Sequence, residues 1–146
     1  MKKLFLLTLA IFTLSIATAK ADNDRVITKD KLPASSQTFI SNYFSKLKIS
    51  YVKEEHDLFD KNFEVVFTDG TKLEFLRNGN WKEVDCRYSE VPADIVPQQI
   101  RNYVKEHYEG EKILQIDRDR NDYEVRLSNR LELTFDKNYN IIDIDD

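Results

Sequence analysis

The sequence predicts an α+β protein in which helices pack on one face of a single antiparallel sheet. Two stretches, residues 62–86 and 122–145, each contain three short runs that alternate apolar and polar residues. Turn-forming residues separate these runs, which is typical of an antiparallel three-strand meander. The two stretches also resemble each other, and this predicts that one helix-plus-strands unit is used twice.

The internal similarity continues upstream of the strands. Residues 63–65 match residues 123–125, and residues 32–34 match residues 91–93. A unit this small is expected to bury its apolar face against its twin. The predicted repeats are therefore about residues 32–86 and 91–146 of one domain, residues 22–146.

The N-terminus is expected to be a secretory signal peptide, residues 1–21. Met1-Lys2-Lys3 is followed by an uncharged apolar run over residues 4–17 and by Ala19-Lys20-Ala21, a small-x-small cleavage site. The run is too short to span a bilayer as an ordinary helix, and a short membrane anchor is the alternative. We expect cleavage near Ala21 and a periplasmic or secreted mature chain that is not inserted in a membrane.

The charge of the chain disfavours two classes of partner. It has 22 basic and 26 acidic residues. The predicted cleavage removes Lys2, Lys3 and Lys20 and no acid, which leaves 19 basic and 26 acidic residues and a net charge near -7. Binding to nucleic acid or to an anionic membrane surface depends on basic patches, so neither is expected.

In the first half, a polar and extended start over residues 22–31 is expected to lead into a helix. Ser35 or Ser36 can cap this helix. Its apolar stripe recurs at helical spacing and comprises Phe39, Ile40, Tyr43, Phe44 and Leu47. A strand at residues 49–52 and a loop at residues 56–61 follow. Asp69-Gly70 and Asn78-Gly79 then predict two tight hairpin turns.

The second half is expected to repeat this order. Pro97 suits the first turn of a helix that ends near Gly110. The predicted strands of this half lie at residues 112–117, 123–128, 130–135 and 140–144. Cys86, the only cysteine, falls between the halves, so no intramolecular disulfide can form, and we expect it to be a small apolar residue at a strand end.

Alternation along the strands separates a helix-facing side from an open side. The apolar parity puts Val84 and Cys86, and likewise Ile142 and Ile144, toward the helices. Trp81 and Ile141 then fall on the open side, where a large aromatic among polar residues is typical of an interaction site. The predicted binding residues are Trp81, Glu83, Glu132, Thr134, Ile141 and Asp143. The alternative is that Trp81 packs on a neighbouring strand or on the N-terminal arm.

Motifs for catalysis or metal binding are missing from the sequence. Residues 117–121 resemble the start of a calcium loop, but Asp122 and Ser128 stand where an EF-hand needs glycine and a bidentate glutamate. His56 and His107 do not have zinc-site spacing. The three glycines cannot build a nucleophile elbow or a phosphate-binding loop. We therefore predict a protein that is not an enzyme and has no catalytic residues, metal or cofactor.

These runs resemble a known family. Val-Pro-Ala-Asp-Ile at residues 91–95, Tyr-Glu-Val-Arg-Leu-Ser-Asn at residues 123–129 and Gly-Asn-Trp-Lys-Glu-Val-Asp-Cys at residues 79–86 are similar to the PepSY-like, β-lactamase-inhibitor-like proteins exported by Bacteroides and relatives. Two positions depart from the family pattern. Arg130 replaces the glycine of a usual Asn-Gly turn, and Tyr139 stands where glycine is common, so those hairpins are expected to be looser.

The resemblance implies a β-lactamase-inhibitor-like fold with tandem helix-plus-sheet units, and it supplies no catalytic residues. Related PepSY domains are thought to restrain peptidases, and the inhibitor that names the fold grips an enzyme with its concave sheet. We therefore expect an exported, non-catalytic protein that holds a protein or peptide of the envelope on its open sheet face, with restraint of a peptidase as one form of that binding. The alternative is a small-ligand or signal-sensing domain that uses the cleft between the halves.

Overall fold

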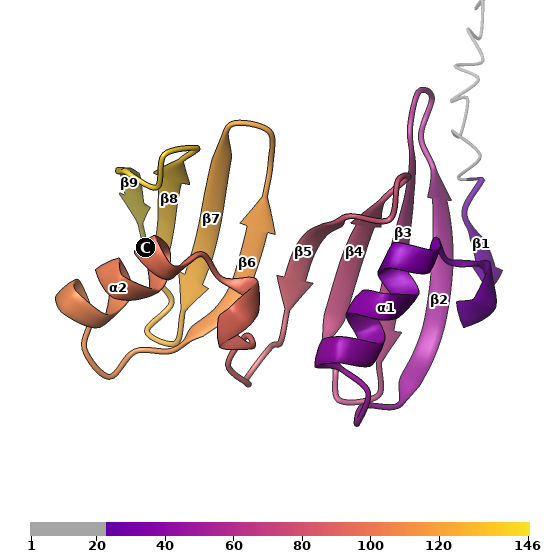
Figure 1. Cartoon of the computed structure of the whole chain (residues 1–146), viewed down its shortest axis with the longest axis horizontal. Coiled ribbons are helices and arrows are strands. Elements are labelled where there is room, and N and C mark those ends of the chain that lie inside the picture. Colours follow the sequence, from indigo (N-terminus) through magenta and orange to yellow (C-terminus); the bar gives the residue numbers. More distant parts are fainter. Residues whose placement is uncertain (1–22) are drawn as a thin grey trace, which may run out of the picture.

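The computed structural model describes residues 23–146, and the predicted signal peptide lies outside them. The described residues contain no helix that is long and apolar enough to cross a membrane. Nine strands form one antiparallel sheet in the order in which they occur along the chain (Figure 1). The strands are β1 (Arg25–Ile27), β2 (Ile49–His56), β3 (Lys61–Phe67), β4 (Lys72–Leu76), β5 (Trp81–Asp85), β6 (Ile113–Arg118), β7 (Asp122–Leu127), β8 (Glu132–Asp136) and β9 (Ile141–Asp145).

Two α-helices pack on the same face of this sheet, one in each half of the chain (Figure 1). The helices are α1 (Ala34–Tyr43) and α2 (Gln98–His107), and short 3-10 turns, η1 (Lys29–Lys31) and η2 (Ala93–Ile95), precede them. Phe39 of α1 meets Phe75 of β4 edge to face, with ring centroids 5.7 Å apart. Tyr103 of α2 meets Phe135 of β8 in the same way at 5.3 Å. The predicted α+β class with helices on one side is confirmed.

The core lies between the helices and the sheet and is continuous across both halves. Five apolar residues that alternate along β3 and β4 are at most 3% exposed: Phe63, Val65, Phe67, Leu73 and Phe75. At the junction, Val84 of β5 pairs with Ile116 of β6, and both are fully buried. The two halves therefore share one sheet and one core.

The predicted hairpin turns form, and the two turns without glycine also close. Gly70 and Gly79 have φ angles of 89° and 87°, values that glycine adopts without steric cost. Arg130 and Tyr139 hold φ angles of 76° and 66°. Their backbone N–H groups donate to Leu127 O at 3.0 Å and Asp136 O at 2.9 Å. The looser hairpins expected here are therefore not found.

The two serines expected to cap α1 have a different role. Pro33 is the residue before the helix, and no side chain caps the helix N-terminus. Ser36 Oγ donates to Gly79 O at 2.9 Å, and Ser35 Oγ donates to Asn78 O at 3.3 Å. The serines therefore fasten the helix to the β4–β5 turn, and a Cβ on Gly79 would lie 2.1 Å from Ser35 Oγ.

The first hairpin is longer than predicted, and the N-terminal segment adds a strand. β2 continues to His56, so only residues 57–60 form the turn. Glu54, which is 4% exposed, interrupts the apolar pattern of β2. The sequence therefore did not indicate that the strand continues beyond residue 52. Glu54 is paired with Arg25 of β1 at 3.1 Å and with Lys61 of β3 at 2.9 Å. These ion pairs join β1, β2 and β3. The sequence predicted an extended start in place of β1 and a loop from the end of β2 to the start of β3, because both segments are polar.

Candidate functional site

The face of the sheet opposite the helices, called here the open face, carries no helix of residues 23–146 (Figure 1). Five carboxylates lie side by side across its five central strands. Glu64 pairs with Glu74, Glu74 with Glu83, Glu83 with Asp117, and Asp117 with Glu124. We call these five residues the acidic row. Like charges directly opposite one another on a sheet are destabilising, so this arrangement has a cost to folding.

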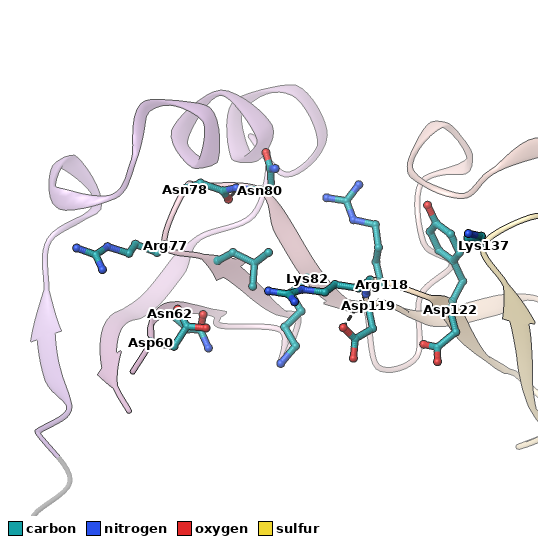
Figure 2. A pocket seen from close by; sticks show the side chains of 13 residues that line it. Asp60, Asn62, Arg77, Asn78, Asn80, Lys82, Arg118, Asp119, Asp122 and Lys137 are labelled. Atoms are coloured by element: carbon teal, nitrogen blue, oxygen red, sulfur yellow. Dashed lines mark hydrogen bonds between the residues drawn. The ribbon is translucent and has the colours of Figure 1, made fainter. Parts of the chain in front are cut away.

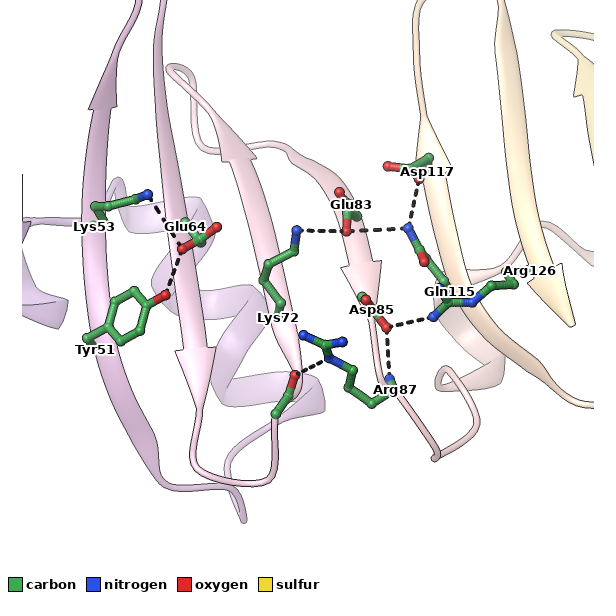
Figure 3. A network of polar contacts seen from close by, with 11 residues as sticks. Tyr51, Lys53, Glu64, Lys72, Glu83, Asp85, Arg87, Gln115, Asp117 and Arg126 are labelled. Atoms are coloured by element: carbon green, nitrogen blue, oxygen red, sulfur yellow. Dashed lines mark hydrogen bonds and ion pairs between the residues drawn. The ribbon is translucent and has the colours of Figure 1, made fainter. Parts of the chain in front are cut away.

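Two members of the acidic row, Glu64 and Glu83, are paired with cations (Figure 3). Lys53 Nζ lies 3.8 Å from Glu64 Oε1, and Lys72 Nζ lies 3.2 Å from Glu83 Oε1. Glu74, Asp117 and Glu124 form no ion pair with another described residue. The row therefore retains negative charge at neutral pH.

Polar contacts hold the carboxylates at the junction of the two halves in place (Figure 3). Gln115 Nε2 donates to Asp117 Oδ2 at 3.1 Å and to Glu83 Oε1 at 3.4 Å. Next to them, Arg126 Nη2 donates to Asp85 Oδ1 at 3.2 Å. Glu83, Asp85 and Asp117 are thus positioned by neighbours on β6 and β7 and form an ordered surface.

Burial and mutual repulsion change the acidity of the row. Burial, followed by the nearby Glu83 carboxylate, raises the pKa of Glu74 to about 7. The same two causes raise the pKa of Asp117 to about 6. The pKa of Glu124 is also raised, chiefly by burial and by the charge of Glu132. Cations brought close to the row would lower these pKa values and relieve the repulsion.

Four of the six predicted binding residues lie on the open face. Glu83 belongs to the acidic row, and Thr134 and Asp143 continue its line of register, because Glu124 pairs with Thr134 and Thr134 with Asp143. Glu132 lies on the same face, opposite Arg126. Their role in binding remains a prediction.

The predicted position of Trp81 is wrong, because Trp81 lies on the helix side. Glu83 pairs with Glu74, but Trp81 pairs with Phe75, so Lys82 is an extra residue in β5. This β-bulge reverses the alternation at the start of the strand. The Trp81 ring lies 6.4 Å from that of Phe39 on α1. Trp81 therefore packs on the edge of the core against α1, whereas the alternative stated from the sequence expected a neighbouring strand or the N-terminal arm.

The predicted position of Ile141 is wrong for the same reason, a β-bulge in the second half. Thr134 pairs with Asp143, but Phe135 pairs with Ile141, so Ile142 is the bulge residue of β9. Ile141 packs against the core, while Ile142 is 59% exposed. Ile144 keeps its predicted side, opposite buried Leu133, but is 50% exposed on the last strand.

Four members of the acidic row, Glu64, Glu74, Asp117 and Glu124, were missing from the predicted binding residues. The sequence contains a signal for three of them, since glutamate follows the first apolar residue of three predicted strands in Phe63-Glu64-Val65, Leu73-Glu74-Phe75 and Tyr123-Glu124-Val125. Nothing in the sequence places Asp117 beside Glu83, because that contact depends on how the two halves pair.

Other candidate chemistry finds no support in residues 23–146. No group of three or more histidine, cysteine, aspartate or glutamate side chains in this part of the chain could hold a metal ion. The run that resembles a calcium loop is a strand end and hairpin turn, in which Asp119 N donates to Asp122 O at 2.9 Å. Cys86 is buried, and burial raises the pKa of its thiol to about 12, so it is the small apolar residue predicted.

Comparison with known proteins decides the family. The family model described as "Putative beta-lactamase-inhibitor-like, PepSY-like" matches residues 61–143, more than half of the chain. The chain belongs to this PepSY-like family. The match includes the acidic row, all of β5 and the first three residues of β9. No curated protein sequence matches the chain.

Solved structures similar to this PepSY-like chain come from Bacteroides. A "putative periplasmic protein" of Bacteroides vulgatus is 48% identical, with a TM-score of 0.84, and the match covers 86% of this chain and 99% of that one. A "putative calcium-regulated periplasmic protein" of Bacteroides thetaiotaomicron is 47% identical, with a TM-score of 0.82 and coverage of 84% and 97%. A third, from Bacteroides vulgatus and of unknown function, is 38% identical, with a TM-score of 0.81 and coverage of 84% and 99%. No catalytic activity is indicated for any of them.

Proposed function

We propose that this PepSY-like chain is an exported, non-catalytic binding protein that holds a cationic segment of a protein or peptide on its open face. The observation that carries the proposal is the acidic row. Its five carboxylates are aligned on adjacent strands, and three of them lack an ion-pair partner among the described residues. Lysine or arginine side chains of a partner would supply the missing charge.

The balance of energies favours a cationic partner over an apolar one. All side chains of the row except that of Glu124 are partly withdrawn from water, with Glu83 12% exposed and Glu64 14% exposed. The repulsion that raises the pKa values of Glu74 and Asp117 is present in the free protein and would be relieved on binding. A cationic partner therefore recovers free energy that folding has lost, and electrostatic attraction also speeds its association.

The periplasmic descriptions of the similar structures support an envelope location for the partner. Restraint of an envelope peptidase is one form that the binding would take, in line with the β-lactamase-inhibitor-like description of the family. We further propose that the two helix-plus-strands units arose by duplication. In that case the open face joins equivalent surfaces of both units across β5 and β6.

Calcium is a second candidate ligand of the open face, held by no more than two carboxylates at a time, since no larger group of metal-binding side chains in the described residues could hold an ion. A relative that is 47% identical is described as calcium-regulated, and carboxylate oxygens are the ligands that Ca²⁺ prefers. Calcium ions near the acidic row would neutralise the carboxylates that we assign to the cationic partner. Calcium would then act as a competitor that releases the partner.

The proposal is tested by fluorescence anisotropy with a labelled oligolysine peptide. The test variant is Glu74→Gln/Glu83→Gln/Asp117→Asn. The control variant, Asp94→Asn/Glu106→Gln/Glu109→Gln, removes the same charge from exposed positions around α2. We expect the test variant to bind at least about tenfold more weakly than the control, because three charge-assisted contacts are lost. Equal affinities for the two variants would show that only net charge matters and would refute the assignment to the acidic row.

The same titration is repeated with calcium and with magnesium at equal ionic strength. Displacement of the peptide by calcium but not by magnesium would support calcium as a regulator of this face. Equal displacement by both ions would indicate charge screening and would remove calcium as a candidate.

A further inference from the structure

A groove of about 870 Å³ lies at one end of the sheet, and Figure 2 shows the side chains that line it. Both halves line it, through residues of the β2–β3, β4–β5, β6–β7 and β8–β9 connections and of the adjoining strand ends. Pockets for small molecules have volumes of about 300 to 1,000 Å³. The groove therefore has the capacity for a small ligand.

The charge of this groove is opposite to that of the chain. Five lining residues are cations: Arg77, Lys82, Arg118, Arg120 and Lys137. Three lining residues are acids: Asp60, Asp119 and Asp122. The whole chain has a net charge of -4, so the positive charge of this groove differs in sign from that of the chain as a whole. We call this surface the basic groove.

The five cations of the basic groove form no ion pair with another described residue. Every ion pair within residues 23–146 involves other basic residues, so none of the five is paired with a described carboxylate. Lys82 is the bulge residue of β5, and its position at the groove follows from the bulge that turns Trp81 toward α1. The groove thus gathers five cations that are not held in ion pairs with other described residues, although three acids also line it.

Arg118 is the most firmly positioned of the five. Its guanidinium lies over the Trp81 ring, 4.1 Å from the centroid, and its Nη2 donates to Trp81 O at 2.7 Å. Burial lowers the pKa of Arg118, which remains charged at neutral pH. A guanidinium held in this way keeps donors for a carboxylate or phosphate and loses little side-chain entropy when it binds one.

We propose that the basic groove binds a small molecule that carries a carboxylate or phosphate group, with Arg118 as the principal anion contact. A long polyanion is disfavoured because Asp60, Asp119 and Asp122 border the groove and the acidic row lies on the adjoining face. The proposal is independent of the partner assigned to the open face, since the two sites have no residue in common.

The test uses NMR with the ¹⁵N-labelled mature chain, residues 22–146, titrated separately with inorganic phosphate, citrate, glucuronate and glucose. We expect saturable shifts confined to the groove, including the Arg118 side-chain N–H, with at least one anion and none with glucose. Comparison of the phosphate titration with the citrate and glucuronate titrations shows whether the groove binds a phosphate or a carboxylate group. Absence of saturable shifts with all three anions, or shifts spread evenly over the surface, would overturn the proposal.

Three variants locate the site. Arg118→Gln is expected to weaken anion binding about tenfold or more, as for loss of a hydrogen bond to a charged group. Arg120→Gln tests the groove at an exposed turn residue that does not contact Trp81, so its effect does not depend on the stability of the fold. Lys105→Gln, exposed on α2, is the matched control and should bind like the wild type. If Arg118→Gln and Arg120→Gln both bind as the control does, the assignment is wrong.

Discussion

Replacement of Glu74 by glutamine should stabilise the protein at neutral pH. Glu74 lies at the centre of the first half of the acidic row, between Glu64 and Glu83. Its pKa is raised from 4.5 to about 7, chiefly by burial and then by Glu83. The native state therefore binds more protons than the unfolded state between these pH values, and stability falls as pH rises through this range. Glutamine removes both the charge and this pH dependence.

The size of the effect follows from the change in pKa. The difference between 4.5 and about 7 corresponds to about 3.4 kcal/mol at about 1.36 kcal/mol for each pKa unit. Solvent reaches part of the Glu74 side chain, and Glu83 relaxes when the charge is removed, so we expect about 1 to 2 kcal/mol at neutral pH. For a domain of this length, that gain raises the thermal midpoint by about 3 to 8 °C.

The assay is thermal unfolding followed by circular dichroism at about pH 5 and about pH 8. Glu106→Gln is the control, since Glu106 is an exposed carboxylate on α2 and not on the open face. We expect Glu74→Gln to be more stable than the control at the higher pH and similar to it at the lower pH. If Glu74→Gln is destabilised at the higher pH, or has the pH profile of the control, the carboxylates of the row do not repel one another as argued.

Three further predictions test the packing. Trp81→Ala should lower stability by about 2 to 4 kcal/mol in urea unfolding, because Trp81 packs against Phe39 and the core edge; an unchanged midpoint would mean that Trp81 is free for binding. Gly79→Ala should cost about 2 to 4 kcal/mol and Gly110→Ala only about 1 kcal/mol, because both have positive φ but only Gly79 would clash; similar losses would contradict this. Cys86 should resist thiol reagents at neutral pH until the protein unfolds; labelling of the native protein at the rate of the unfolded chain would refute its burial.

The fold class and the turns could be predicted from the sequence because their causes are local. The dipeptides Asp69-Gly70 and Asn78-Gly79 accept positive φ wherever they occur, and both close hairpins. Alternation in residues 63–67 separates the buried side of β3 from the open side without reference to the rest of the chain. The family resemblance also depended on such local runs, and the family match confirms it.

The candidate sites could be predicted only in part, because two features that form them, the β-bulge in β5 and the pairing of the two halves, depend on tertiary contacts. The bulge at Lys82 places Trp81 beside Phe39 and Arg118, whereas alternation alone puts Trp81 on the opposite face. A single inserted residue of this kind leaves no trace in the period of a five-residue strand.

The second feature that depends on tertiary contacts is the pairing of the two halves. The sequence by itself determined two meanders, their helices and the polar character of one face. The pairing of β5 with β6 aligned Glu83 with Asp117 and so made one acidic row from two short sets of carboxylates. It also brought Arg118 to Trp81 at the basic groove. Both sites exist because residues distant in the chain share one register, and only the packing of the whole sheet sets that register.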